Sequence, residues 1–215
     1  MPHPARPALL ATLALLAAAA CSDDPSTLAP APVDGPSADA SPRVDPALLG
    51  PWTEIADPVV GATASPPTFT FEADGTYLAR CAAGLATCAY QAADGHLTLD
   101  CPGAAVAHRR APYFVDGGRL YLEAFVREGE GVGVIGSWTS TAEQVGAVHR
   151  KRYVVRADGS VGIVVTVDGT PVVELSGTWR GTGDHLTIDT VRDGAPHREH
   201  LMLADDRLGV GYQRP

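Results

Sequence analysis

The chain has 215 residues, of which 25 are acidic and 16 are Lys or Arg, and its formal net charge is −9. Nucleic-acid binding comes mainly from neutralising phosphates with Lys and Arg, so this charge argues against a nucleic-acid partner. The same charge repels anionic lipid head groups, so attachment to a membrane requires a covalent anchor.

Residues 1–20 have the three-part layout of a secretory signal peptide. Arg6 supplies the positive end, and the apolar run from Ala8 to Ala20 is shorter than the roughly 20 residues that a membrane-spanning helix needs. Small residues then lead to Cys21, which resembles a lipobox, with Ala18 where that motif usually has Leu or Val. The resemblance implies cleavage before Cys21 and its acylation with fatty chains such as palmitate. The alternative is an ordinary cleaved signal with an incidental cysteine.

Residues 21–47 follow as a stretch rich in Pro, Ala, Ser and Asp, with scarcely any large apolar side chain before Leu48. Such a segment cannot bury enough surface to offset the entropy lost on ordering, so we predict a disordered tether. A polar tether behind an acylated cysteine fits a lipoprotein. Ser22, in place of Asp, resembles the sorting pattern for the outer membrane of Gram-negative bacteria. We therefore expect an exported, lipid-anchored protein on the periplasmic or surface face of the outer membrane.

The remaining chain consists of two similar halves, residues 48–135 and 136–215. Four blocks recur in the same order: Gly50-Pro51-Trp52-Thr53 as Gly136-Ser137-Trp138-Thr139, Phe69 to Thr76 as Tyr153 to Ser160, His96 to Asp100 as His185 to Asp189, and Asp116 to Leu120 as Ala204 to Leu208. Scattered Asp-Gly turns alone do not explain the Gly-x-Trp and His-Leu-Thr blocks. The recurrence predicts an internal repeat.

Each block has the pattern of a strand or a turn. Phe69 and Phe71 alternate with polar residues, which is the period of a half-buried strand, and Asp-Gly pairs such as Asp94-Gly95 are strong hairpin signals. After residue 20 no stretch sustains a helical period. The prediction is an all-β antiparallel meander of about a dozen short strands, arranged as two small barrel or sandwich units. One larger barrel or sandwich built from both repeats fits the spacing equally well.

The Gly-x-Trp opening, the aromatic strand that ends in Asp74-Gly75-Thr76, and Tyr77 together resemble the start of bacterial lipocalin-like domains. The resemblance covers about the first third of each repeat. It implies an up-and-down barrel with a cavity, in which Trp52 and Trp138 are structural residues that pack across the closed end. Each repeat is small for a roomy barrel, because interior width follows strand number.

Three cysteines besides Cys21 would lie in a compartment that permits disulfides. Cys81 could pair with Cys88 across a short hairpin. Cys88 could instead pair with Cys101 across the Asp94-Gly95 turn, where the register places these two residues opposite each other. One thiol is left over in either case.

Histidines give two patterns that suggest chemistry. His197-x-x-His200 has the spacing of a metal-binding pair, but residues three apart on a strand point to opposite faces, so we predict surface histidines and no metal. His96 and His185 occupy equivalent positions after turns, and we interpret them as turn or edge residues rather than as a duplicated active site.

Two further segments have features of binding sites. Gly131 to Gly136 spells a dinucleotide fingerprint, but Ser137-Trp138-Thr139 predicts a strand where the phosphates would need a helix. The run from His149 to Arg152 is densely basic, and His108-Arg109-Arg110 is a weaker second run. The dense run could dock an anionic envelope component such as lipopolysaccharide, and the alternative is a solvated strand end.

No catalytic motif is present, so we predict that the protein is not an enzyme and needs no cofactor. The leading hypothesis is a lipid-anchored lipoprotein that binds a small apolar ligand or an envelope component. The competing hypothesis is a structural or protein-interaction module with a packed interior. An apolar cavity of at least ~300 Å³ would favour the first, and an interior filled by side chains would favour the second.

Overall fold

The computed structural model describes residues 43–58, 66–81, 84–102 and 107–215. The predicted signal peptide, Cys21 and nearly all of the tether lie outside these residues. Within them the chain forms strands and turns without helices, so none of the described residues belongs to a helix able to cross a membrane. The predicted all-β antiparallel meander is confirmed.

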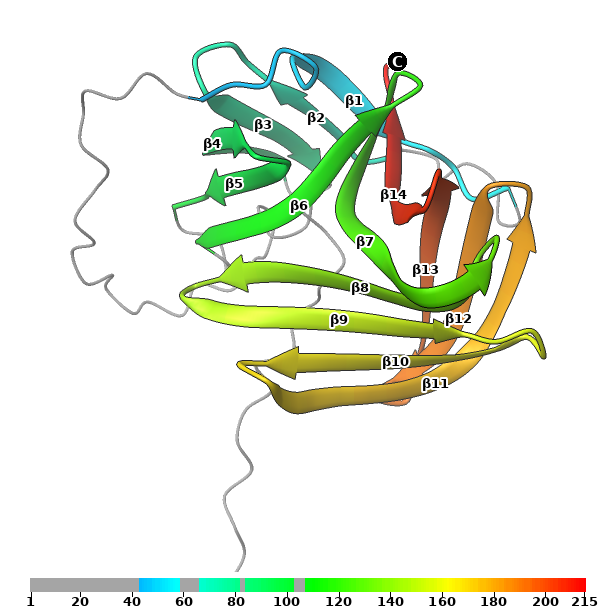
Figure 1. The fold of residues 1–215 in the computed structure, drawn as a ribbon. Coiled ribbons are helices and arrows are strands. Elements are labelled where there is room, and N and C mark those ends of the chain that lie inside the picture. The colour runs from blue at the N-terminus through cyan, green and yellow to red at the C-terminus, as the bar shows by residue number, and fades with distance from the viewer. Residues whose placement is uncertain (1–42, 59–65, 82–83, 103–106) are drawn as a thin grey trace, which may run out of the picture.

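The described residues form fourteen strands. They are β1 (Gly50–Glu54), β2 (Thr68–Phe71), β3 (Thr76–Cys81), β4 (Gly84–Ala93), β5 (His96–Asp100), β6 (His108–Asp116), β7 (Arg119–Val132), β8 (Ile135–Gln144), β9 (Ala147–Val155), β10 (Ser160–Val167), β11 (Thr170–Thr182), β12 (His185–Arg192), β13 (Ala195–Ala204) and β14 (Arg207–Gln213). Each strand pairs with the next, and β1 pairs with β14, so the sheet is closed (Figure 1).

A second set of pairings divides this closed sheet. β7 and β14 pair directly, with Leu120 opposite Tyr212 and Phe125 opposite Leu208. On its other edge β7 pairs first with β6 and then with β8, and β14 pairs with β13 and then with β1. The shared β7–β14 ladder therefore belongs to two rings. We call β1 to β7 with β14 ring 1, and β8 to β14 with β7 ring 2; Figure 1 shows β7 curving from one into the other.

Each ring has its own apolar core. Ring 1 encloses a buried cluster that includes Trp52, Phe69, Phe71 and Tyr90, and ring 2 encloses one that includes Trp138. The two clusters follow from strand alternation, because every second side chain points inward. The partly buried Val210 of the shared ladder packs against both cores, so the interiors of the two rings meet there.

The first strand of each ring is fixed by the same contacts. The indole Nε1 of Trp52 donates to the backbone carbonyl four residues earlier at 2.6 Å, and Trp138 does the same at 2.9 Å. A guanidinium lies over each indole: Arg214 over Trp52 at 4.6 Å, and Arg127 over Trp138 at 4.1 Å. Both tryptophans are buried. These cation–π contacts stabilise by about 0.5–2 kcal/mol each.

The same arginines also donate to backbone carbonyls at the start of each half. Arg127 of β7 donates to the carbonyl of Ile135 at 2.7 Å, and Arg214, which follows β14, donates to the carbonyl of Leu49 at 2.7 Å. The last strand of each half thus fastens the start of the other half. The domain boundaries at 48–135 and 136–215 stay a prediction.

Candidate functional site

A cluster of ionisable side chains is buried where the two rings meet, and we call it the seam cluster. It consists of Arg109 from β6, Glu123 from β7, Lys151 and Tyr153 from β9, and His197 and Glu199 from β13. Arg109, Glu123 and Lys151 are each no more than 5% exposed. Charged groups this deep are costly unless they are paired, so their contacts decide what the cluster can do.

Strand alternation splits the predicted basic run between two faces. Lys151 points inward with Tyr153, whereas Arg150 and Arg152 point outward and are about half exposed. Both outward arginines form ion pairs with Glu128 of β7, Arg152 at 3.4 Å. The run is therefore not one continuous basic surface. An anionic partner for Arg150 and Arg152 stays a prediction.

The carboxylate of Glu199 is surrounded by donors. Lys151 Nζ donates to its two oxygens at 2.9 and 2.8 Å, His197 Nε2 lies 3.2 Å away, and the Tyr153 hydroxyl donates to Oε2. Burial alone would raise the pKa of Glu199, but the Lys151 ammonium and these hydrogen bonds outweigh it and hold the pKa far below its ordinary value. Glu199 is therefore an ionised acceptor rather than a proton donor.

The second buried ion pair joins Arg109 to Glu123. Glu123 lies at a β-bulge in β7, with a φ of +55°, where the register with β14 shifts between Leu208 and Val210. An extra residue in one strand re-aims the neighbouring side chains, which explains how a glutamate enters the seam. Arg109 Nε has no hydrogen-bond partner among the described residues.

A cavity of about 180 Å³ lies against the seam cluster. Glu123, Lys151, Tyr153 and Glu199 line it, and Glu54 of β1 faces it from ring 1. Burial raises the pKa of Glu54. The cavity is smaller than the ~300 Å³ at which sites for drug-sized ligands begin, and its lining mixes charged side chains with apolar ones such as Leu122 and Leu201.

His197 and His200 point to opposite faces of β13, as the geometry of a strand requires. His197 lies inside with Glu199, and His200 lies on the outer face, where its Nε2 is 2.8 Å from Nδ1 of His185. His96 is instead near the carbonyl of Asp94 in its own turn, at 3.0 Å. Among the described residues no three His, Cys, Asp or Glu side chains are grouped as ligands of one metal ion.

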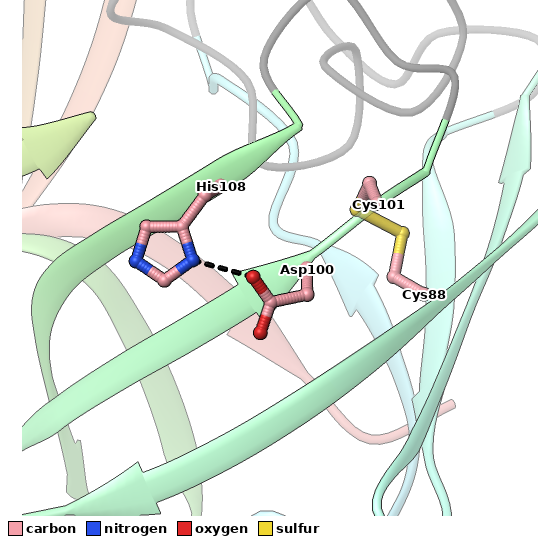
Figure 2. The surroundings of a disulfide bond; sticks show 4 residues. All are labelled: Cys88, Asp100, Cys101 and His108. Atoms are coloured by element: carbon pink, nitrogen blue, oxygen red, sulfur yellow. Dashed lines mark hydrogen bonds and ion pairs between the residues drawn. A yellow bond between two sulfur atoms is a disulfide. The ribbon is translucent and has the colours of Figure 1, made fainter. Parts of the chain in front are cut away.

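The structure distinguishes between the two predicted cysteine pairings. Cys88 and Cys101 form a disulfide between β4 and the end of β5, with their Cα atoms 4.4 Å apart (Figure 2). The pairing of Cys81 with Cys88 is therefore wrong. Beside the bridge, His108 Nδ1 contacts Asp100 on the neighbouring strand, and both side chains are about half exposed.

The glycine-rich segment does not precede a helix. Gly131 lies near the end of β7, Gly133 is in the turn, and Gly136 is already in β8. Rejection of the dinucleotide site is therefore consistent with the fold.

The seam cluster itself was not identified from the sequence. One signal was available, because Lys151, the sole lysine, alternates in phase with Tyr153 and Val155. The sequence gives no such signal for Glu123 and Glu199. Glu123 reaches the cluster through a bulge in β7, and Glu199 reaches Lys151 only when ring 2 closes.

Comparison of the chain with protein-family models, with curated proteins and with solved structures found no match. We therefore infer the function from the geometry of the described residues.

Proposed function

We propose that this protein is an exported, lipid-anchored envelope lipoprotein whose two-ring body is a non-catalytic structural or protein-interaction module. The observation that carries this proposal is the filling of both rings by side chains. Trp52, Phe69, Phe71 and Tyr90 are all at most 2% exposed in ring 1, and Trp138 is fully buried in ring 2. Rings of eight strands are just wide enough for their own side chains to fill.

An apolar ligand in the interior is the weaker alternative. The cavity at the seam holds only about 180 Å³, and Glu123, Lys151 and Glu199 lie in its wall beside apolar residues. A small apolar molecule there would desolvate charged groups without offering them hydrogen bonds, which is unfavourable.

The protonation states of Glu199 and Tyr153 support the absence of catalysis in this proposal. General acid–base chemistry needs a group that exchanges its proton near the working pH. Glu199 is held ionised by its donors, and burial with the nearby Glu199 raises the pKa of Tyr153 well above its ordinary value. Both groups are thus fixed in one protonation state at neutral pH.

The proposed anchor fits the way in which the described chain begins on ring 1. The carbonyl of Arg43 accepts a hydrogen bond from Ala92 N at 2.7 Å, and the Tyr113 hydroxyl donates to Asp45 at 2.6 Å. Residues 43–47 at the end of the predicted tether therefore contact ring 1, so an anchor would pull on a fixed point of this ring.

Native mass spectrometry of the detergent-extracted protein tests the packed interior. We expect the mass of the processed, acylated chain with no further bound molecule, and no saturable binding of a fluorescent fatty acid. A stoichiometric lipid that is released only on denaturation would contradict the proposal and favour the apolar-ligand alternative.

Fractionation tests the anchor separately. We expect Cys21→Ala to move the protein from the membrane to the aqueous fraction, while the matched variant Cys81→Ala remains in the membrane. Retention of Cys21→Ala in the membrane would contradict the lipid anchor without affecting the packed-interior proposal.

A further inference from the structure

The seam cavity is lined by polar groups that differ in how far they are satisfied. On the side of ring 2, the carboxylate of Glu199 has donors for both of its oxygens. On the side of ring 1, Glu54 of β1, Glu123 of β7 and Tyr212 of β14 line the cavity. These three side chains have hydrogen-bonding capacity that the described residues do not use.

Glu54 and Tyr212 face the cavity from two paired strands. They lie directly opposite each other in the β1–β14 ladder, whose strands are side by side in Figure 1, so they share one face of the sheet. Tyr212 is only 4% exposed, yet its hydroxyl has no hydrogen-bond partner among the described residues. Burial holds the pKa of Tyr212 well above its ordinary value, so this hydroxyl stays neutral and can accept a hydrogen bond. A buried hydroxyl without a partner indicates that a further molecule binds beside it.

Glu123 offers a second unused acceptor. Its side chain is also buried, and Arg109 donates to its Oε1 atom. Its Oε2 atom has no partner within the described part of the chain. The bulge in β7 therefore brings one satisfied and one unsatisfied carboxylate oxygen to the seam.

Glu54 is the charged group of the lining that has no counter-ion among the described residues. Three ion pairs neutralise the other charged groups around the cavity: Lys151–Glu199, Arg109–Glu123 and Arg198–Asp189. Burial raises the pKa of Glu54, as expected for a carboxyl that lacks a cation. The lining is thus short of one positive charge.

We propose that the seam cavity binds a small organic monocation, a primary ammonium on a short aliphatic chain, with its charge against Glu54. The three N–H groups of such an ammonium match three acceptors, which are the Glu54 carboxylate, the Tyr212 hydroxyl oxygen and Glu123 Oε2. The aliphatic chain packs against the apolar part of the lining, where Leu122 and Leu201 lie. The cation would lower the free energy of the Glu54 carboxylate in the way that Lys151 does for Glu199.

Other small occupants fit these groups less well. Water supplies hydrogen bonds but no charge for Glu54. An anion would be repelled by Glu54 and Glu123. A metal ion would leave the apolar lining uncovered, and among the described residues no three His, Cys, Asp or Glu side chains are grouped as its ligands. A volume of about 180 Å³ accommodates an ammonium of a few carbon atoms.

This site is independent of the packed rings and of the lipid anchor. A cation of this size binds weakly and exchanges freely, so it is not retained when the protein is purified. A lipid found inside the rings would contradict the proposed function without bearing on the cation site.

Isothermal titration calorimetry of the full-length protein in detergent, with n-propylammonium chloride at neutral pH, tests the site. We expect saturable one-to-one binding with a dissociation constant of about 1–10 mM, because a ligand of so few non-hydrogen atoms cannot bind tightly. Sodium propionate, 1-propanol and sodium chloride at the same concentration should give no saturable heat. Absence of saturable n-propylammonium binding, or equal binding of 1-propanol, would overturn the proposal.

Variants locate the binding at Glu54. Glu54→Gln keeps the shape of the side chain but removes its charge, and it should weaken n-propylammonium binding by at least about tenfold. Tyr212→Phe removes one acceptor and should weaken binding by about threefold to tenfold. The matched control is Glu72→Gln, which neutralises an exposed glutamate outside the lining and should keep the wild-type affinity. Thermal unfolding verifies that each variant is folded, and equal affinities of wild type and Glu54→Gln would refute the assignment.

Discussion

Lys151 and Glu199 form a buried ion pair whose stability depends on its surroundings. The desolvation of both ions is offset only because Lys151 binds both carboxylate oxygens and Tyr153 and His197 complete the set. Such a pair adds little net stability compared with apolar residues, but removing one partner leaves a buried, uncompensated charge. The seam cluster therefore specifies where β9 and β13 must meet rather than driving folding.

Lys151→Met should lower the free energy of unfolding by about 3–5 kcal/mol, because Glu199 remains buried without its cation. Lys151→Met combined with Glu199→Leu should recover much of that loss, since no charge then stays unpaired. Urea denaturation of the three proteins measures both effects. Equal losses in the single and the double variant would show that packing, and not charge, dominates at this site.

The depressed pKa of Glu199 gives a pH dependence with a defined sign. A carboxyl whose folded pKa lies below its ordinary value of 4.5 contributes stability that is present above that value and is lost as pH falls toward the folded pKa. The stability difference between wild type and Glu199→Gln should therefore be largest above about pH 5 and shrink below it. Denaturation curves from pH 7 to pH 3 check this, and a difference that grows on acidification would contradict it.

At the scale of strands, the two repeats join corresponding hairpin positions in different ways: Cys88 and Cys101 of the first repeat correspond to Gly177 and Thr190 of the second. The Cys88–Cys101 bridge joins β4 to the end of β5 in ring 1. In ring 2, Gly177 of β11 lies opposite Thr190 of β12. A Cβ at Gly177 would lie 2.2 Å from the Asp189 carbonyl oxygen, so the close approach of the two strands requires glycine.

Gly177→Ala should consequently destabilise the protein by about 1–3 kcal/mol, because backbone atoms must move to admit one methyl group. Gly162→Ala, in the adjacent strand β10, is the matched control. Its Cβ would meet nothing closer than 3.8 Å, so its effect should lie within about 0.5 kcal/mol of zero or be stabilising. Thermal unfolding of the two variants distinguishes these outcomes, and equal losses would argue against the strand contact.

Loss of the disulfide should cost about 2–4 kcal/mol, because the bridge closes a loop of moderate length in the unfolded chain. The sequence separation of Cys88 and Cys101 is 13 residues. The variant Cys88→Ala with Cys101→Ala should therefore unfold at a lower temperature than wild type. A reducing agent should lower the unfolding temperature of wild type and leave that of the variant unchanged. A wild-type protein insensitive to reduction would contradict the contribution of the bridge.

At the scale of the whole molecule, the two rings depend on each other. Ring 1 is closed by β14, which comes from the end of the chain, and ring 2 is closed by β7. Arg214 covers Trp52 and Arg127 covers Trp138, so each half also supplies the cation that covers the indole of the other. An isolated half would expose the unpaired edges of its first and last strands.

Separate expression of residues 43–133 and 134–215 tests this dependence. Each fragment alone should fail to give a cooperative unfolding transition, because its ring lacks a closing strand. Mixing the two fragments should restore one transition and a one-to-one complex. Circular dichroism and size-exclusion chromatography measure both, and a first fragment that unfolds cooperatively on its own would contradict the exchange of strands.

The sequence determined the local features of this protein. Alternation from Phe69 to Phe71 and Asp-Gly pairs such as Asp94-Gly95 were sufficient to predict strands, turns and the antiparallel meander, because these depend on neighbours in the chain. The same local register allowed the pairing of Cys88 with Cys101 and required opposite faces for His197 and His200.

Only the tertiary structure decided how the halves close and which charges meet. The β7–β14 ladder joins residues far apart in the chain, and Glu123 enters the seam through a bulge that no turn residue signals. The contact of Lys151 with Glu199 joins strands β9 and β13, which belong to different hairpins. The contact of His185 with His200 joins diagonal positions on the paired strands β12 and β13. Alternation along one strand shows which of its side chains share a face. The closure of the sheet and the register between distant strands follow instead from packing of the whole sheet.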